Sequence, residues 1–284
     1  MSKVPFKSFC LQRHRASDEV VRPAVMGVLN VTPDSFSDGG QYNSATVAYD
    51  RAMEMIAQGA SIIDIGGEST RPGAAIVSLD EELDRVIPVI ERLRASSDIA
   101  LSIDTSKPAV MLAAKDAGAS LINDVCALTQ ADALQVAAQT GLPICLMHMQ
   151  GSPQTMQDRP SYESVVDEVM AYLQSRRDAC LAAGICEERL IIDPGFGFGK
   201  TLQHNLQLFA HLPRFHALGL PILIGVSRKS MFGQLLGREV EQRLAGSIAM
   251  AAMAVEKGVA IIRTHDVVET CDAIDVAVAV ATAD

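Results

Sequence analysis

The chain has 284 residues, of which 49% are hydrophobic and 20% are charged, and its formal net charge is −10. This length fits one large α/β domain or two small ones, and the hydrophobic fraction is enough for a sizeable core. The negative charge argues against a protein built mainly to bind nucleic acid or an anionic membrane, although a local basic pocket for a small anion is compatible with it.

The cysteine pattern and the lack of long apolar runs indicate a cytoplasmic protein. The six cysteines are scattered, with no C-x-x-C pair and no zinc-ligand spacing, which favours reduced thiols over disulfides. No run approaches the ~18 apolar residues of a membrane helix, and the N-terminus lacks the apolar stretch of a signal peptide. Residues 1–23 carry no motif, and we expect them to precede a single domain over residues 24–284.

Short apolar runs alternate with helical patterns along the chain. The runs expected to form buried strands are 24–29, 61–65, 99–103, 121–122, 143–147, 190–192, 221–224 and 259–262. The segments expected to be helical are 45–58, 79–95, 108–117, 131–139, 162–183, 206–218, a stretch ending near 257–258, and 267–281. Eight strands alternating with eight helices predict an α/β fold, a single-domain (β/α)8 TIM barrel, with an open doubly wound sheet as the alternative.

Polar residues gather at or just beyond the carboxyl ends of the predicted strands, which is the face of such a barrel that carries chemistry. They are Asn30, Asp104, Asn123, His148, Asp193, Lys229, Arg263 and His265. Helix capping is the alternative role for Asp104, and Asn123 could cap or shape a turn in the same way. The alternative for His148 is a structural role. The alternative for the cations after the last two strands is a solvated basic cluster.

The stretch LIIDPGFGFGKT (190–201) is the clearest example of a strand that delivers an acid, Asp193, to the mouth of a site. Its glycines let the backbone turn sharply and approach a neighbour closely. Pro194 stands where a phosphate-binding P-loop needs glycine, and Lys200 stands where the dinucleotide fingerprint needs its third glycine. Both of these motifs are therefore excluded.

The distribution of charge around the predicted barrel mouth indicates the kind of ligand. Acids and amides follow the third, fourth and sixth strands, whereas cations follow the seventh and eighth. This division suits a molecule with a donor-rich heterocyclic edge at one end and a phosphorylated group at the other. No H-x-x-x-H or H-E-x-x-H pattern indicates zinc. A Mg²⁺ carried by a diphosphate needs only one or two protein oxygens, and Asn30 could supply one.

Blocks of sequence in consistent order resemble the dihydropteroate synthase family from about residue 24 to the end of the chain. They are GVLNVTPDSFSDGG (27–40), IDIGGESTRPGA (63–74), SIDTSKP (102–108), INDV (122–125), MHMQG (147–151), DPGFGFGK (193–200), GVSRKS (225–230) and RTHDV (263–267). The resemblance implies condensation of p-aminobenzoate with a 6-hydroxymethyl-7,8-dihydropterin diphosphate. The products would be 7,8-dihydropteroate and pyrophosphate, in folate biosynthesis, by an enzyme that is a sulfonamide target.

The resemblance also implies roles for individual residues. The pterin-binding set would be Asp104, Asn123, Met147, Asp193, Gly225 and Lys229. Pyrophosphate would be bound by Asn30, Arg263 and His265, with Asn30 as the Mg²⁺ ligand. The aminobenzoate pocket would comprise Phe36, Thr70, Arg71, Pro72, Phe198 and Ser230. The residues expected to act in catalysis are Asp104, Asp193, Lys229, Arg263 and His265.

These roles predict a dissociative displacement, in which the acids stabilise a pterin cation and the cations stabilise the leaving pyrophosphate. Two rival readings remain. Lys229 could form a Schiff base in an aldolase-like barrel, or the barrel could bind a pterin without turnover, for example to present a methyl-folate to a corrinoid partner. The apolar last two helices suit a homodimer, although core packing explains them nearly as well.

Overall fold

Eight parallel strands form a barrel in the computed structural model, which describes residues 20–32, 41–70, 73–152 and 154–283. The strands are β1 (Ala24–Asn30), β2 (Ile62–Gly66), β3 (Ala100–Asp104), β4 (Leu121–Asp124), β5 (Ile144–Met147), β6 (Leu190–Asp193), β7 (Leu223–Gly225) and β8 (Ile261–Thr264). Their order is β6-β5-β4-β3-β2-β1-β8-β7. The Ile192 N–H donates to Pro221 O at 3.0 Å, and Ile192 is bridged to Ile222, so the two ends of the sheet meet. The predicted TIM barrel is confirmed, and the open sheet is excluded.

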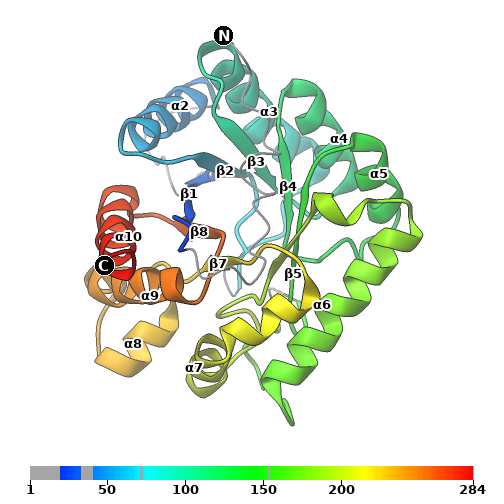
Figure 1. The fold of residues 1–284 in the computed structure, drawn as a ribbon. Coiled ribbons are helices and arrows are strands. Elements are labelled where there is room, and N and C mark those ends of the chain that lie inside the picture. The colour runs from blue at the N-terminus through cyan, green and yellow to red at the C-terminus, as the bar shows by residue number, and fades with distance from the viewer. Residues whose placement is uncertain (1–19, 33–40, 71–72, 153, 284) are drawn as a thin grey trace.

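Helices surround the strands, which lie at the centre of the view in Figure 1. They are α2 (Gln41–Ala57), α3 (Leu79–Ser96), α4 (Pro108–Ala117), α5 (Ala133–Thr140), α6 (Val165–Ala182), α7 (Leu202–Ala210), α8 (Ser230–Leu236), α9 (Leu244–Glu256) and α10 (Val267–Ala281). Short 3₁₀ turns are η2 (Glu187–Arg189), η3 (Leu212–Leu218) and η4 (Val240–Gln242). None of the helices in the described part is long and apolar enough to cross a bilayer.

Two predicted helices differ from the structure. The segment 206–218 is not one helix, because α7 ends at Ala210 and a separate 3₁₀ turn follows with a proline in its first turn. The stretch before β8 is also divided. Gly237 adopts a left-handed conformation with φ of 64° and ends α8, and α9 begins only at Leu244. The short helix α8 is therefore an addition to the predicted one-strand-one-helix alternation.

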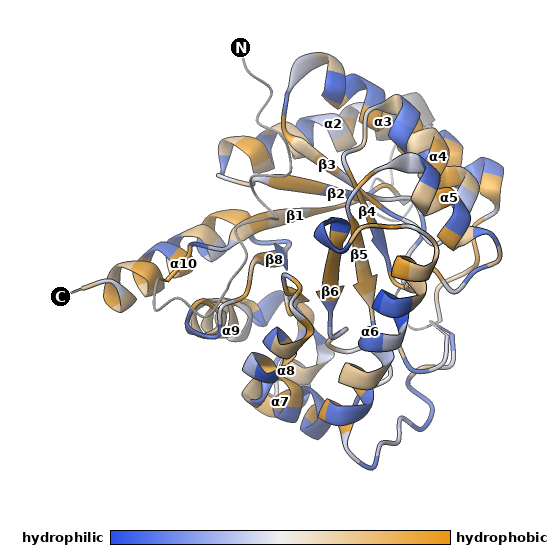
Figure 2. Ribbon diagram, turned by 45° about the vertical axis from the view of Figure 1, so that its right-hand side comes forward, coloured by the Kyte–Doolittle hydropathy of each residue, from blue (hydrophilic) through white to orange (hydrophobic). Residues whose placement is uncertain are grey.

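Side chains alternate between the inside and the outside of the barrel, as the two-residue period of a strand requires. The inside, toward the amino ends of the strands, is filled by a buried apolar layer of Ala24, Met26, Ile62, Leu121, Cys145, Ile191, Leu223 and Ile261. Neighbouring strand residues face outward and pack with the helices in the larger core cluster. In Figure 2 the strands are mostly orange, whereas the helices carry both colours. Four of the next inward positions, nearer the carboxyl ends, are polar: Asp64, Asn123, Asp193 and Arg263.

Candidate active site

Four side chains from four strands form one hydrogen-bonded group inside the barrel. Arg263 of β8 donates from Nε to Asp64 Oδ2 at 2.6 Å and from Nη2 to Asp104 Oδ2 at 2.8 Å. Asn123 of β4 donates from its amide nitrogen to the same Asp64 oxygen at 3.0 Å. Arg263, Asp64 and Asn123 each follow an apolar residue of the inner layer by two positions, which turns them toward the barrel axis.

Asp64 is the member of this group that was not among the predicted site residues. It is fully buried at the middle of β2, where it accepts hydrogen bonds from both Arg263 and Asn123. Its other oxygen, Oδ1, is buried without a hydrogen-bond partner among the described residues, and so is the hydroxyl of Ser102 on the adjacent strand. The signal in the sequence was an acid at an inward position of an otherwise apolar strand.

Burial and the ion pairs have opposite effects on the pKa values of Asp104 and Arg263. It raises the pKa of Asp104 above its ordinary value, although the charge of Arg263 lowers it. For Arg263, burial disfavours the charged form, yet Asp64 and Asp104 together raise its pKa. The guanidinium therefore stays charged and holds two carboxylates, and its Nη1 is not committed to either of them.

The capping alternatives for Asp104 and Asn123 are wrong. The residue that precedes α4 is Lys107, and no side chain caps that helix. Asn123 is bound to Asp64, as described above, and the turn after β4 is shaped by its neighbour Asp124. That carboxylate accepts hydrogen bonds from the backbone of Cys126 and Leu128, both at 2.8 Å. Asp104 and Asn123 are thus left facing the barrel interior.

The turn after β6 packs directly against the β5–α6 loop. Gly195 and Gly199 have φ of 70° and 64°. A Cβ at Gly195 would lie 1.9 Å from His148 O, and one at Gly199 would lie 2.6 Å from Gln150 O, so a side chain at either position would collide with backbone. Asp193, just before the turn, accepts a hydrogen bond from the Gly195 N–H at 2.7 Å. Burial raises the pKa of Asp193, and this bond opposes the rise.

Lys200, at the end of the same turn, is buried and hydrogen-bonded within the protein. Its Nζ lies 2.9 Å from His148 Nδ1 and donates to the carbonyls of Gly195 at 2.9 Å and Phe198 at 3.0 Å. Burial lowers the pKa of Lys200 to about 7. It also lowers the pKa of His148 to about 3, with the Lys200 charge adding to the effect. The structure thus supports the structural role for His148.

Lys229, one residue before α8, packs against the same turn. Its Nζ is 4.2 Å from the centre of the Phe198 ring, and a Cβ at Gly197 would lie 3.2 Å from its Cδ. Burial and the charge of Arg263 lower its pKa, whereas Asp193 and Asp104 raise it. Lys229, Asp193, Asp104 and Arg263 are therefore close enough to interact electrostatically, as the sequence predicted.

His265 is fixed by Ser227, a residue that the sequence did not single out. The His265 backbone N–H donates to Ser227 Oγ at 3.2 Å, and the imidazole Nδ1 lies 3.0 Å from the same oxygen. The hydroxyl already accepts from the backbone, and when its own proton is donated to Nδ1 the neutral imidazole carries its proton on Nε2. Burial and then Arg263 lower the pKa of His265 to about 3, so the unliganded ring is neutral.

The remaining predicted site residues occupy the ends of strands or the loops beyond them. Asn30 is half-buried at the end of β1, and Met147 is buried at the end of β5. Gly225 ends β7 beside Arg263, and a Cβ there would lie 3.9 Å from the arginine side chain. Thr70 lies in the β2–α3 loop, and Ser230 begins α8. Phe36, Arg71 and Pro72 lie outside the described residues.

Comparison with known proteins shows what the chain is similar to. A family model described as pterin binding enzyme matches residues 26–265. The chain is 54% identical over 258 residues to dihydropteroate synthase of Escherichia coli (strain K12), covering 91% of this chain and 92% of that protein.

Two solved structures are similar over most of their length. Yersinia pestis dihydropteroate synthase, in a sulfonamide drug complex, has a TM-score of 0.89 and 52% identity, covering 96% of this chain and 100% of that chain. Xanthomonas albilineans dihydropteroate synthase with 4-aminobenzoic acid has a TM-score of 0.88 and 52% identity, covering 93% of this chain and 95% of that chain.

Proposed function

The chain belongs to the dihydropteroate synthase family of pterin-binding enzymes, and we infer that it joins p-aminobenzoate to 6-hydroxymethyl-7,8-dihydropterin diphosphate. The products are 7,8-dihydropteroate and pyrophosphate, and the reaction is a step of folate biosynthesis. The observation that carries this function is the polar layer inside the barrel, where Asp104, Asn123 and Asp193 are grouped with Lys229 and Arg263. Such a layer offers acceptors to a heterocycle and cations to a diphosphate.

The pterin end of the proposed site is formed by the two acids, Asn123 and Lys229, with Met147 and Gly225 as walls. A carboxylate matches two adjacent N–H groups of the pterin with two parallel hydrogen bonds. Burial raises the pKa of both Asp104 and Asp193. Hydrogen bonds from ligand N–H groups would lower these pKa values again, because they stabilise the ionised carboxylates. Glycine at position 225 keeps the space beside Arg263 open for a flat ring.

The diphosphate end is formed by Arg263, His265 and Asn30. Arg263 has one nitrogen beyond its two carboxylate contacts. With Ser227 as the donor to Nδ1, His265 presents an Nε2–H donor. Among the described residues there is no group of three or more His, Cys, Asp or Glu that could hold a metal. A Mg²⁺ that arrives with the diphosphate fits this chain, because it needs few protein oxygens and the Asn30 amide can supply one. When bound, it supplies charge neutralisation for the leaving pyrophosphate.

The aminobenzoate end involves Phe198, Ser230 and Thr70 among the described residues, and Phe36, Arg71 and Pro72 outside them. The Phe198 ring lies next to the Lys229 ammonium group, and Ser230 is the residue that follows Lys229 in the chain. The acceptor for the pterin carbon would therefore bind directly beside the pterin end. Sulfonamide drugs are expected to compete at this position.

The chemical step is a dissociative displacement. The bond from the exocyclic carbon to the diphosphate oxygen breaks, and pyrophosphate leaves with the electron pair. Asp104 and Asp193 stabilise the positive charge that spreads over the dihydropterin, while Arg263 and the His265 donor stabilise the departing oxygens. The aniline nitrogen then uses its lone pair to form the C–N bond and loses its proton to water. Because that amine is neutral near pH 7, no strong general base is needed.

Pyrophosphate release tests the proposal. The purified protein would be mixed with the dihydropterin diphosphate, p-aminobenzoate and Mg²⁺, and release would be followed while each component is omitted in turn. We expect release only when both substrates are present, and loss of release with a chelator. Pterin binding without release would assign the chain to the non-catalytic alternative, and a borohydride-trapped adduct on Lys229 would favour the aldolase-like one.

The enzyme is proposed to be cytoplasmic. It is also proposed to form a homodimer whose subunits contact each other through α9 and α10. Cys126, Cys180, Cys186 and Cys271 carry free thiols, as a reducing compartment would maintain them. On α10, Val276 is 65% exposed and Val280 is 69% exposed, which suits a covered apolar face. Light scattering should give twice the monomer mass, and Val276→Glu combined with Val280→Glu should give the monomer.

A further inference from the structure

One lysine ties the base of the β2–α3 loop to two neighbouring elements. Lys107, the residue before α4, donates from Nζ to Glu68 Oε2 and, at 2.5 Å, to Glu82 Oε2. Glu68 lies in the β2–α3 loop, two residues before Thr70, and Glu82 lies on α3. A single ammonium group therefore joins this loop to α3 and to the β3–α4 loop. We call Glu68, Glu82 and Lys107 the loop clamp.

Further contacts make the loop clamp the anchor of the whole loop base. Glu68 uses its other oxygen, Oε1, to accept from the Val77 N–H at 3.2 Å, which connects the start of the loop to its return toward α3. Arg85 of α3 donates to Gly67 O at 2.6 Å. A Cβ at Gly67 would lie 3.0 Å from Glu82 Cγ, so the backbone rests closely on the glutamate side chain. The loop base is thus fixed from several directions.

The burial of Glu82 indicates that the loop clamp is more than a surface ion pair. Its side chain is 1% exposed, and its Oε1 is buried without a hydrogen-bond partner among the described residues. A buried carboxylate with an unsatisfied oxygen costs folding free energy, and an apolar residue at that position of α3 would avoid the cost. Burial alone would lower the pKa of Lys107, but Glu68 and Glu82 raise it, so the bridge stays charged.

We propose that Lys107 is a positioning residue for the second substrate: through Glu68 it sets the place of the loop that carries Thr70 and so prepares the aminobenzoate end of the site. This inference rests on the proposed function. The pterin-binding carboxylate Asp104 accepts its hydrogen bond from Arg263 at 2.8 Å, and that bond involves no residue of the loop clamp. Loss of the loop clamp should consequently weaken the binding of p-aminobenzoate far more than the binding of the pterin diphosphate.

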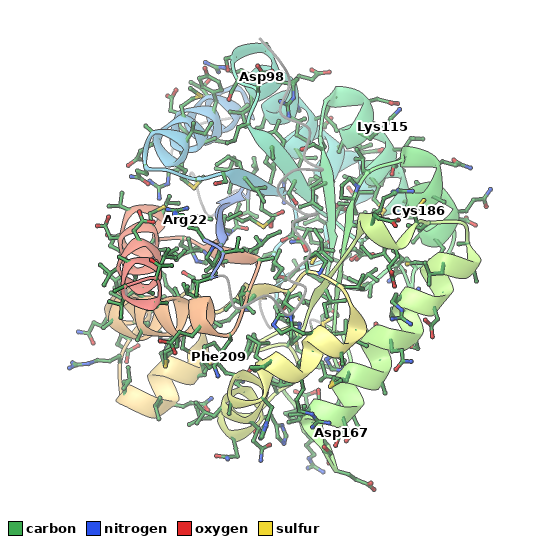
Figure 3. The ribbon with its side chains drawn as sticks, in the orientation of Figure 1. Arg22, Asp98, Lys115, Asp167, Cys186 and Phe209 are labelled. Atoms are coloured by element: carbon green, nitrogen blue, oxygen red, sulfur yellow. The ribbon has the colours of Figure 1, made fainter. Side chains whose placement is uncertain are left out.

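The test compares Lys107→Met and Lys107→Arg with a matched control, Lys115→Met. Lys115 lies on α4 at the outside of the barrel (Figure 3). Its side chain is 40% exposed, and its Nζ is 2.9 Å from Asp116 Oδ1. We expect Lys107→Met to raise the KM for p-aminobenzoate by about tenfold or more, as loss of charge-assisted hydrogen bonds implies. The calorimetric Kd for the pterin diphosphate should change by less than about twofold. Lys107→Arg should recover most of the loss, and Lys115→Met should leave both constants unchanged.

A second readout does not depend on turnover. Amide hydrogen exchange of peptides spanning residues 67–77 should be faster in Lys107→Met, whereas peptides from β8 should be unchanged. Because Lys107→Met leaves the buried Glu82 without its ion-pair partner, Lys107→Met combined with Glu82→Gln would be measured if the single variant does not fold. The proposal would be overturned by equal increases in the KM for p-aminobenzoate and the Kd for the pterin diphosphate. Unchanged amide hydrogen exchange in residues 67–77 would also overturn it. A wild-type chain without pyrophosphate release would instead overturn the proposed function, and the exchange result would still decide the role of Lys107.

Discussion

Two lysines contact the turn after β6, and they differ in what surrounds them. Lys200 has His148 Nδ1 and the carbonyls of Gly195 and Phe198 within 3.0 Å of its Nζ. Lys229 lies over the Phe198 ring and faces Asp193 and Asp104 at longer range. In the described part of the chain, its Nζ makes no hydrogen bond at all.

This difference supports the proposed roles, in which Lys200 holds the turn in place and Lys229 binds the substrate. The hydrogen-bonding capacity of Lys200 is used within the turn, so it fixes the backbone that carries Asp193 and Phe198. Lys229 keeps its donors, and the pKa of its ammonium is lowered by burial and by Arg263. A substrate acceptor would therefore gain the full interaction with Lys229. Both lysines lie in or beside sequence motifs, so position in the sequence does not separate the two roles. The number of hydrogen bonds that each Nζ already makes within the protein does separate them.

The largest effect is expected on stability, from Lys200→Met. The substitution would leave two buried carbonyls and the His148 nitrogen without their partner, and each such group costs about 1–3 kcal/mol. The free energy of unfolding in urea should fall by about 3 kcal/mol or more. Lys229→Met should change it by less than about 1 kcal/mol, since no hydrogen bond to a described residue is lost. A similar fall in the free energy of unfolding in both variants would show that the two lysines do not differ in their structural role.

The next effect is on catalysis, from Lys229→Met. Removal of a charged donor to the substrate should lower kcat/KM by about 100-fold, equivalent to about 2.7 kcal/mol of transition-state stabilisation. Initial rates of pyrophosphate release at varied pterin diphosphate would measure this, with circular dichroism as the control for folding. A variant that keeps near-normal kcat/KM would show that Lys229 does not contact the substrate.

A smaller effect is expected from pH, through Lys200. Its pKa is about 7 in the folded chain against a model-peptide value of 10.5, so above pH 7 the unfolded chain binds more protons at this residue. Stability from Lys200 should then rise with pH, by up to about 1.4 kcal/mol per unit. Urea unfolding of wild type and Lys200→Met at pH 7, 8 and 9 would show a widening difference. A constant difference would mean that the ammonium form persists in the folded chain.

The barrel and much of its polar layer could be predicted from the sequence because both follow from short-range patterns. Apolar runs of strand length marked the strands, and polar residues at their ends were placed correctly on one face. Arg263, Asp104 and Asn123 do meet inside the barrel. The positions of helices were also apparent, except where Pro213 follows α7 and Gly237 ends α8.

The parts that could not be predicted depend on long-range contacts. Asp64 is buried beneath Arg263, a residue 199 positions away, and an acid within an apolar run has no local sign of its partner. Lys200 stands in a familiar glycine-rich stretch, but its role depends on carbonyls that the turn directs inward. Ser227 fixes the His265 ring across two strand ends. In each case the partner is set by backbone geometry or by the barrel register.

The buried acids of this layer are proposed to act on the pterin, and Asp193→Asn is the sharpest test of that role. The substitution keeps the shape of the side chain and an oxygen for the Gly195 N–H. Steady-state pyrophosphate release by wild type and variant would be compared at saturating p-aminobenzoate. We predict release by the wild type only with both substrates, and a fall of about 100-fold or more in the folded variant. Near-normal release by Asp193→Asn would mean that this acid does not act on the pterin.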